Sequence, residues 1–433
     1  MRGMPAYGNG RRGARHGRRG PALRVVALVA VAALAACSSP STPGSDGPST
    51  AGVAQAGATT TPSAAPTPTP TAPAPVVTVA GGSKIGYGKR VRLAVTGGSF
   101  TSVQVATAKG AVALDGDIAP DGATWLSEET PTPGTSYVVA ATVKDAVGQD
   151  RPSAAKFAVK PVPVDQKLGF TVSPAAGAKV GVAEPIVVQF LTAVTEKAAV
   201  EKRLVVDART PSGESVVGSW HWLSDTQVDW RPKEFWTPGT KVSLNMRVGG
   251  VKAAAGRYGR KDYAQTFTIG AKRLLKVDLT THTAKLYHGS KLVGTWPTGG
   301  GKRGLETYSG TYTVLNKSQT IQMDSCSARI TCDKKNPEYY DQEVFWATRI
   351  TRSGTFVHAA PWDGLMGRAN VSHGCVHLST RNARMFFEQA VTGDPVIVSR
   401  SGRGPQERIA TKDPGLYPWN LSWKKWVAGS ALA

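Results

Sequence analysis

The stretch HAAPWDGLMGRANVSHGCVHL, residues 358–378, determines how the rest of the sequence is interpreted. It holds Cys375 together with three histidines, His358, His373 and His377. A thiol attacks as its thiolate, and its ordinary pKa of about 8.5 leaves only a few per cent ionised at neutral pH. An imidazole, with an ordinary pKa of about 6.5, can take that proton and later return it to a leaving amine. The stretch therefore predicts a cysteine nucleophile with nearby histidine bases.

Gly374 precedes the cysteine, and a glycine there allows the backbone N–H groups of Gly374 and Cys375 to face a developing oxyanion. Three plainer interpretations are ordinary polar histidines, a zinc site, and a disulfide at Cys375. The HxCxH spacing lacks the paired ligand spacings of structural zinc sites. Spacing does not choose the base, because His373 and His377 flank the cysteine on one strand face, whereas His358 must arrive through the fold.

The motif SHGCVHL, preceded by a histidine in FVHAAPW, resembles the signature of the L,D-transpeptidases, which have a YkuD-type catalytic domain. The resemblance covers about residues 273–400 and continues toward the C-terminus. His377 departs from the pattern, because the family usually has Asn or Arg at this position.

The resemblance implies that Cys375 is the nucleophile and His358 its base, oriented by the main-chain carbonyl of Ala359. It implies that His373 supports the thiolate and its loop, and Gly374, beside the cysteine, is counted with the catalytic residues. The implied substrate-binding residues are Met323, Tyr340, Ser353, Gly354, Trp362, Ser372 and His377. No cofactor and no metal are required.

The implied reaction joins peptidoglycan stem peptides by a 3→3 cross-link, through a thioester on Cys375 and with release of D-alanine. Carbapenem-type β-lactams are the implied inhibitors. Two alternatives are an L,D-carboxypeptidase, in which water takes the same thioester, and a wall-binding lipoprotein that has no catalytic activity.

The N-terminal part predicts export. Residues 1–36 contain seven arginines, no acidic residue and an apolar run at 25–36, which is typical of a signal peptide and too short for a permanent membrane span. The run ends in LAACS, which resembles a lipobox, so Cys37 is predicted to carry the lipid that anchors the chain to the outer face of the cytoplasmic membrane. An ordinary signal peptide is the alternative. Residues 37–75 are predicted to be this lipidated cysteine and a disordered Pro/Thr/Ala linker reaching into the wall.

The chain has a formal net charge of +22, and +15 remains without the seven N-terminal arginines. A basic surface suits an anionic wall polymer or a membrane, and it also suits nucleic acid. Because no nucleic-acid-binding motif is present, peptidoglycan and the membrane are the predicted partners, and nucleic acid is not.

Residues 76–270 alternate between apolar and polar positions, which is typical of strands with one buried face. A repeat divides these residues into two parts. Gly134 follows Trp125, Gly239 follows Trp230 at the same spacing, and the two pairs lie 105 residues apart. We therefore expect two immunoglobulin-like sandwiches, at 76–160 and 161–270, which act as spacers. Their tryptophans, including Trp220 and Trp222, are expected in the core.

Short strands predict a β-rich catalytic domain with few helices at 271–400, so the fold class is mainly β. The run at 299–301 is expected to be a flexible glycine loop, without the lysine of a phosphate-binding loop. A helix should begin after Ser379 and end at Gly393. The extension at 401–433 is expected to pack on the catalytic domain.

Residues 319–343 form a long predicted loop, at the place where the resemblance implies a lid over the active site. Cys326 and Cys332 lie six residues apart in a chain predicted to be exported, which favours a disulfide that stiffens the loop. Two free thiols are the alternative. A disulfide here leaves Cys375 as the remaining thiol of the mature domain, the pattern of a reactive cysteine.

Overall fold

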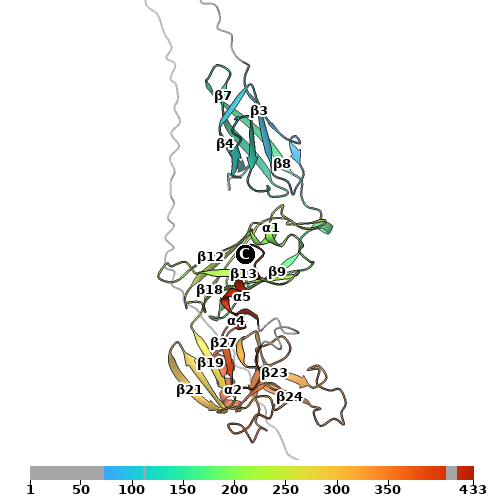
Figure 1. Ribbon diagram of the computed structural model, residues 1–433, viewed down its shortest axis with the longest axis vertical. Coiled ribbons are helices and arrows are strands. Elements are labelled where there is room, and N and C mark those ends of the chain that lie inside the picture. Colours follow the sequence, from blue (N-terminus) through green and yellow to red (C-terminus); the bar gives the residue numbers. More distant parts are fainter. Residues whose placement is uncertain (1–72, 111–113, 406–416) are drawn as a thin grey trace, which may run out of the picture. The chain divides into compact units, whose positions relative to one another are not determined.

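The computed structural model describes residues 73–110, 114–405 and 417–433. The predicted signal peptide, Cys37 and nearly all of the predicted linker lie outside these residues. The described residues form three β-rich domains with a few short helices, so the predicted fold class is confirmed (Figure 1). Across the described ranges, no helix is both long and apolar enough to cross a membrane.

The first domain contains two four-stranded sheets, with strand orders β1–β3–β6–β5 and β2–β8–β7–β4. The strands are β1 Val76–Val79, β2 Lys84–Ile85, β3 Arg92–Thr96, β4 Gly98–Thr107, β5 Gly116–Ile118, β6 Thr124–Ser127, β7 Ser136–Asp145 and β8 Asp150–Val159. The alternating apolar residues of both sheets face one core that includes Leu93, Trp125 and Val139. Burial of one face of each sheet stabilises the sandwich.

The second domain repeats this plan with sheets β10–β18–β15–β12 and β13–β14–β11–β9, and a hairpin, β16–β17. Its strands are β9 Phe170–Ser173, β10 Lys179–Val180, β11 Ile186–Phe190, β12 Leu204–Arg209, β13 Gly218–Ser224, β14 Gln227–Pro232, β15 Lys241–Met246, β16 Lys252–Ala254, β17 Arg257–Tyr258 and β18 Tyr263–Ile269. Two short helical segments are η1 Val164–Gln166 and α1 Lys197–Glu201. Trp220 and Trp230 are buried in its core, and Trp222 packs against that core partly exposed.

The sequence repeat corresponds to a structural repeat. Gly134 and Gly239 both have positive φ, and their N–H groups donate to the carbonyls of the last residue of β8 and of β18, respectively. Each buried tryptophan also lies against a glycine of the neighbouring strand: a Cβ on Gly116 would come 2.4 Å from the ring of Trp125. Such an approach leaves no room for any side chain but hydrogen.

The third domain has one sheet of order β21–β20–β19–β27–β22 and another of order β23–β24–β25–β26. Its strands are β19 Arg273–Asp278, β20 Thr283–His288, β21 Lys291–Pro297, β22 Gly310–Thr313, β23 Asn316–Asp324, β24 Asp341–Arg349, β25 Phe356–Ala359, β26 Val376–Leu378 and β27 Pro395–Ser399. Strands β25 and β26 are parallel neighbours, so two segments distant in the sequence meet at one sheet edge. The core includes Leu275, Val357 and Val376, each fully buried.

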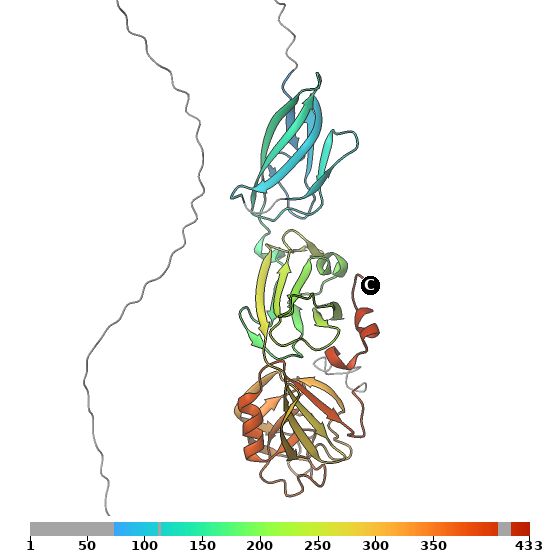
Figure 2. The same ribbon diagram turned by 90° about the vertical axis from the view of Figure 1, so that its left-hand side faces the viewer.

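Helix α2, Thr380–Gln389, packs against β24 and β25 (Figure 2). The Ser379 side chain accepts the N–H of Asn382, as expected of an N-cap. The predicted end at Gly393 is wrong, because the chain is already extended at Ala390. The Asp394 carboxylate accepts the next free N–H, that of Val391, at 2.9 Å, and this contact turns the chain toward β27.

The C-terminal segment contains α4, Tyr417–Asn420, and α5, Trp423–Val427. The Asn420 side chain both donates to and accepts from the backbone of Thr311 on β22, at 2.8 Å each way. Trp426, fully buried, donates its indole N–H to the carbonyl of Ser219 on β13. The segment therefore contacts the third domain through β22, and it also contacts the second domain through β13.

A buried cation accounts for this second contact. The guanidinium of Arg231, on β14, lies 4.9, 5.2 and 4.8 Å from the rings of Trp419, Trp423 and Trp426. Burial lowers the pKa of Arg231 to about 10, so the side chain remains charged at neutral pH. A desolvated cation is stabilised by aromatic faces, and the C-terminal segment supplies three of them.

Candidate active site

The parallel pair β25–β26 brings the distant ends of the signature together. His358 on β25 is in register with His377 on β26, and Cys375 directly precedes β26. A cavity of about 460 Å³ opens beside them. Among the residues that line it are eight that the sequence predicted for the site: Met323, Tyr340, His358, Trp362, Ser372, His373, Cys375 and His377.

His358 is held in one tautomer. Its Nδ1 lies 2.8 Å from the carbonyl oxygen of Ala359, and because a carbonyl can only accept, Nδ1 carries the proton. Nε2 is then the basic nitrogen. The side chain is almost fully buried, and this desolvation, with a further contribution from His377, lowers the pKa of His358 to about 3. At neutral pH the ring is therefore neutral and able to accept a proton.

Cys375 lies where the cavity of about 460 Å³ meets a smaller one, and a third cavity, of about 220 Å³, also includes it. Its side chain is partly buried against a small apolar cluster that includes Val344 and Phe356. A second cavity of about 260 Å³ is lined by Ser353, Gly354, Gly374 and Cys375. The thiol lies 3.9 Å from the carbonyl oxygen of Gly354. Two separate molecules can therefore approach the sulfur, one from each cavity.

Ser372 shapes the turn that carries the cysteine. Its hydroxyl donates to the carbonyl oxygen of Cys375 at 2.6 Å and accepts the N–H of Gly374 at 3.1 Å. Gly374 has φ of 124°, a conformation that favours glycine. In this structure the Gly374 N–H donates to the Ser372 hydroxyl, and a role of the Gly374 and Cys375 N–H groups toward an oxyanion stays a prediction.

The glycine run at 299–301 is a packed platform rather than the expected flexible loop. Gly299 forms a β-bridge with His377, and Gly301 forms one with Ser372. A Cβ on Gly301 would lie 2.0 Å from the carbonyl oxygen of Leu305. The glycine backbone therefore lies directly against the SHGCVHL part of the signature and contacts both ends of that part.

His373 faces the lid. Its Nε2 lies 2.8 Å from Oε2 of Glu338, and the same oxygen lies 2.6 Å from Nζ of Lys302. Burial, and then the Lys302 charge, lower the pKa of His373, whereas Glu338 opposes this shift. The Tyr340 ring lies 4.8 Å from the His373 ring. Burial, aided by Cys375, raises the pKa of Tyr340 to about 12, so its hydroxyl keeps its proton and can donate into the cavity.

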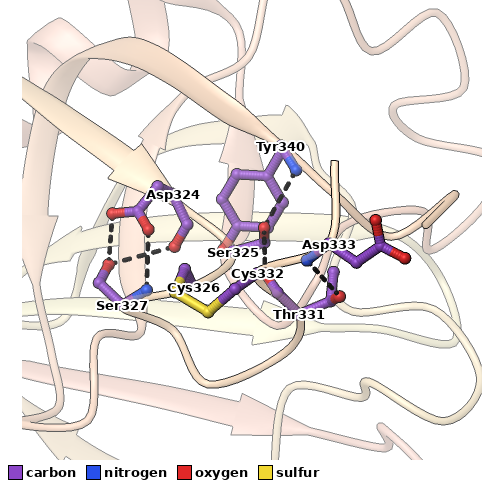
Figure 3. The surroundings of a disulfide bond; sticks show 8 residues. All are labelled: Asp324, Ser325, Cys326, Ser327, Thr331, Cys332, Asp333 and Tyr340. Atoms are coloured by element: carbon purple, nitrogen blue, oxygen red, sulfur yellow. Dashed lines mark hydrogen bonds between the residues drawn. A yellow bond between two sulfur atoms is a disulfide. The ribbon is translucent and has the colours of Figure 1, made fainter. Parts of the chain in front are cut away.

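The lid between β23 and β24 carries a disulfide, which joins Cys326 to Cys332 (Figure 3). Ser325 connects this loop to the cavity wall: its N–H donates to the carbonyl of Tyr340 at 2.9 Å, and its hydroxyl accepts the N–H of Tyr340 at 3.3 Å. The hydroxyl also donates to the carbonyl of Thr331 inside the disulfide loop, at 2.8 Å. The disulfide therefore restrains the backbone that holds Tyr340.

Replacing both Cys326 and Cys332 by serine is expected to destabilise the closed lid by about 2 kcal/mol, because a loop of this size then gains freedom when it opens. Amide exchange at Ser325 should become about thirty-fold faster, whereas exchange at Val357 in β25 should not change. Hydrogen exchange of the oxidised protein and the double variant measures both amides. Equal rates at Ser325 would show that the disulfide does not restrain the lid.

The charged residues that contact the site histidines, Lys302, Glu338 and Asp363, were not predicted. Asp363 lies beneath His377, with its Oδ2 2.8 Å from Nδ1 of the histidine. In the sequence, its position in the Pro-Trp-Asp-Gly turn, inside the signature, was the available signal. Lys302 and Glu338 come close to His373 only because the loops that carry them fold together. Within the described ranges, no cluster of three or more His, Cys, Asp or Glu side chains is arranged to hold a metal ion.

A partly buried thiol, a tautomerically fixed imidazole and two converging cavities define a site of the kind that transfers acyl groups. Comparison with known proteins agrees. Residues 272–398 match the family model of the L,D-transpeptidase catalytic domain, and residues 82–252 match that of a bacterial Ig domain.

L,D-transpeptidase 2 of Mycobacterium tuberculosis is 32% identical over 319 residues, which cover 73% of this chain and 75% of that protein. Probable L,D-transpeptidase 3 of the same species is 35% identical over 252 residues, covering 55% of this chain and 89% of that protein. A solved structure of L,D-transpeptidase 3 from this species, with a faropenem-derived adduct, is 30% identical, covers 55% of this chain and all of that one, and has a TM-score of 0.45. The chain belongs to the L,D-transpeptidase family.

Proposed function

We propose that this enzyme forms 3→3 cross-links between peptidoglycan stem peptides through a thioester on Cys375. The observation that carries the proposal is that Cys375 and His358 line one cavity, with Nε2 of His358 left basic by the Ala359 contact. No cofactor is needed, because thiol, imidazole and amide groups suffice for acyl transfer.

In the first step, the Cys375 sulfur attacks the carbonyl carbon of the third residue in a tetrapeptide stem, and His358 takes the thiol proton. Burial lowers the pKa of His358, so the ring is neutral in the resting site and free to take the proton as the sulfur attacks. The C–S bond forms, the amide C–N bond breaks, and His358 returns the proton to the departing D-alanine. Tyr340, which keeps its hydroxyl proton, can donate to the developing oxyanion.

In the second step, the side-chain amine of a second stem attacks the thioester carbonyl. The new C–N bond forms, the C–S bond breaks, and one amine proton returns the sulfur to the thiol. The two cavities that meet at Cys375 support separate approaches for the donor and acceptor stems. Attack by water in place of the amine would release a tripeptide, which is the L,D-carboxypeptidase outcome.

Carbapenems are proposed to acylate the same sulfur, because ring opening of a β-lactam by a thiol also yields a thioester. We further infer that the chain is exported and anchored through a lipid on Cys37 to the outer face of the cytoplasmic membrane. The composition of residues 1–75 supports this location.

Incubation of the protein with tetrapeptide muropeptides tests the proposal. Cross-linked dimers with equimolar D-alanine are expected. Tripeptide monomers alone would establish the carboxypeptidase, and the absence of both products would establish a wall-binding protein without this activity.

A further inference from the structure

The residue that departs from the family signature is part of a buried hydrogen bond to a carboxylate. Nδ1 of His377 lies 2.8 Å from Oδ2 of Asp363, whose side chain is 1% exposed. The second carboxylate oxygen, Oδ1, accepts the N–H of Leu365 at 3.0 Å. Both oxygens of this carboxylate are therefore engaged, and the aspartate is oriented toward the ring.

The backbone of His377 is fixed on both sides. Its N–H donates to the carbonyl of Gly299 at 2.9 Å, and its carbonyl accepts the hydroxyl of Thr298 at 2.8 Å. With strand and ring both fixed, the Asp363 contact places the proton on Nδ1 and leaves Nε2 as the basic nitrogen.

Two imidazoles thus line the cavity beside Cys375 with the same tautomer. The ring centroids of His358 and His377 lie 5.0 Å apart at 69°. They differ in the group that receives the Nδ1 proton, a neutral carbonyl for His358 and a carboxylate for His377. A carboxylate stabilises the protonated ring better than a carbonyl does, so His377 holds a proton more readily than His358 does.

We propose that His377, positioned by Asp363, is the base that removes the proton from the acceptor amine of the second stem. This inference rests on the proposed function and assigns one step within it. An alkyl ammonium has a pKa of about 10.4, so only about one amine in 2,500 is neutral and nucleophilic at pH 7. His377 takes the proton that this neutral amine must lose as its C–N bond forms, when the nitrogen becomes acidic enough for an imidazole to deprotonate it.

The step balances as follows. The lone pair of the neutral amine forms the C–N bond to the thioester carbon, and Nε2 of His377 takes one of the two amine protons. The C–S bond breaks, its electron pair returns to the sulfur as a thiolate, and the proton held by His377 passes to the sulfur, which restores both the thiol and the neutral ring.

The surroundings set the pH at which His377 acts. Burial lowers the pKa of His377 below its ordinary value, and Asp363 opposes that shift. The other ionisable groups that line the same cavity are Tyr340, His358, His373 and Cys375. Above its lowered pKa the ring is neutral and accepts protons, so cross-linking should remain active through neutral pH and decline as acid protonates the ring.

The test compares His377→Asn and Asp363→Asn with the wild type from pH 5 to 9. Asparagine at 377 restores a side chain usual in the family and removes the base. His288→Asn, at an exposed position on β20, makes the same chemical change outside the cavity and serves as the matched control. D-alanine release, dimers and tripeptides are quantified separately.

At pH 7 we expect both site variants to lose at least tenfold in dimer formation, with less than threefold loss of D-alanine release, and tripeptide to replace the missing dimer. Dimer formation by the variants should rise steeply with pH, because the amine must then lose its proton unaided. His288→Asn should match the wild type.

Two results would overturn the inference: unchanged dimer formation, or an equal fall of dimer and D-alanine at every pH. The second would place His377 in the first step or in folding, and thermal unfolding of the variants distinguishes these. A wild type that releases no D-alanine and forms no carbapenem adduct would instead remove the proposed function, and this inference with it.

Discussion

Cys375→Ala is expected to reduce D-alanine release and cross-linking by at least about 10⁴-fold. Both steps need the sulfur, and without it neither the imidazole nor the oxyanion donors have a covalent intermediate to act on. The cavity changes little, because alanine removes one partly buried sulfur atom. Substrate binding should therefore survive while turnover does not.

Steady-state release of D-alanine and equilibrium binding of a tetrapeptide muropeptide measure the two effects. Ser136→Ala, at an exposed position on β7, makes a similarly small change far from the site in the sequence and is the matched control. Turnover by Cys375→Ala within tenfold of the wild type would show that another residue is the nucleophile.

The second large effect is on stability. Trp426→Ala is expected to lower the free energy of unfolding by about 3 to 5 kcal/mol. Trp426 is fully buried, stacks on His221 at 4.6 Å and donates its indole N–H to Ser219. Its removal would also take one of three aromatic faces from the buried Arg231 cation.

Trp423→Ala is the matched control. Trp423 also faces Arg231, at 5.2 Å, but is only partly buried, so its loss should cost about 1 kcal/mol. Urea unfolding monitored by circular dichroism compares the two variants. If Trp426→Ala were within 1 kcal/mol of the wild type, the C-terminal segment would not be a stabilising element of the second domain.

The sequence predicted best what depends on local pattern. Period-two alternation identified the strands, and the tryptophan repeat identified two similar domains, because both reflect burial of one strand face. The signature indicated which residues share the site, and the structure places His358, His373, Cys375 and His377 around one cavity.

What the sequence did not predict depends on pairing between distant loops. Asp363 meets His377 only because the turn after β25 folds under β26, and Glu338 reaches His373 only from the lid. The sequence could not predict that the Gly374 N–H donates to the Ser372 hydroxyl, because this contact depends on side-chain geometry. The contact between the C-terminal segment and the second domain depends on a buried cation on β14. No periodicity in the sequence indicates such a contact.

The most direct test of the account is the intact mass of the protein after brief exposure to a carbapenem, followed by peptide mapping. The account predicts one adduct per chain, located on Cys375, formed at neutral pH and absent from Cys375→Ala. An unmodified Cys375 in a folded wild-type protein, or an adduct at any other residue, would contradict it.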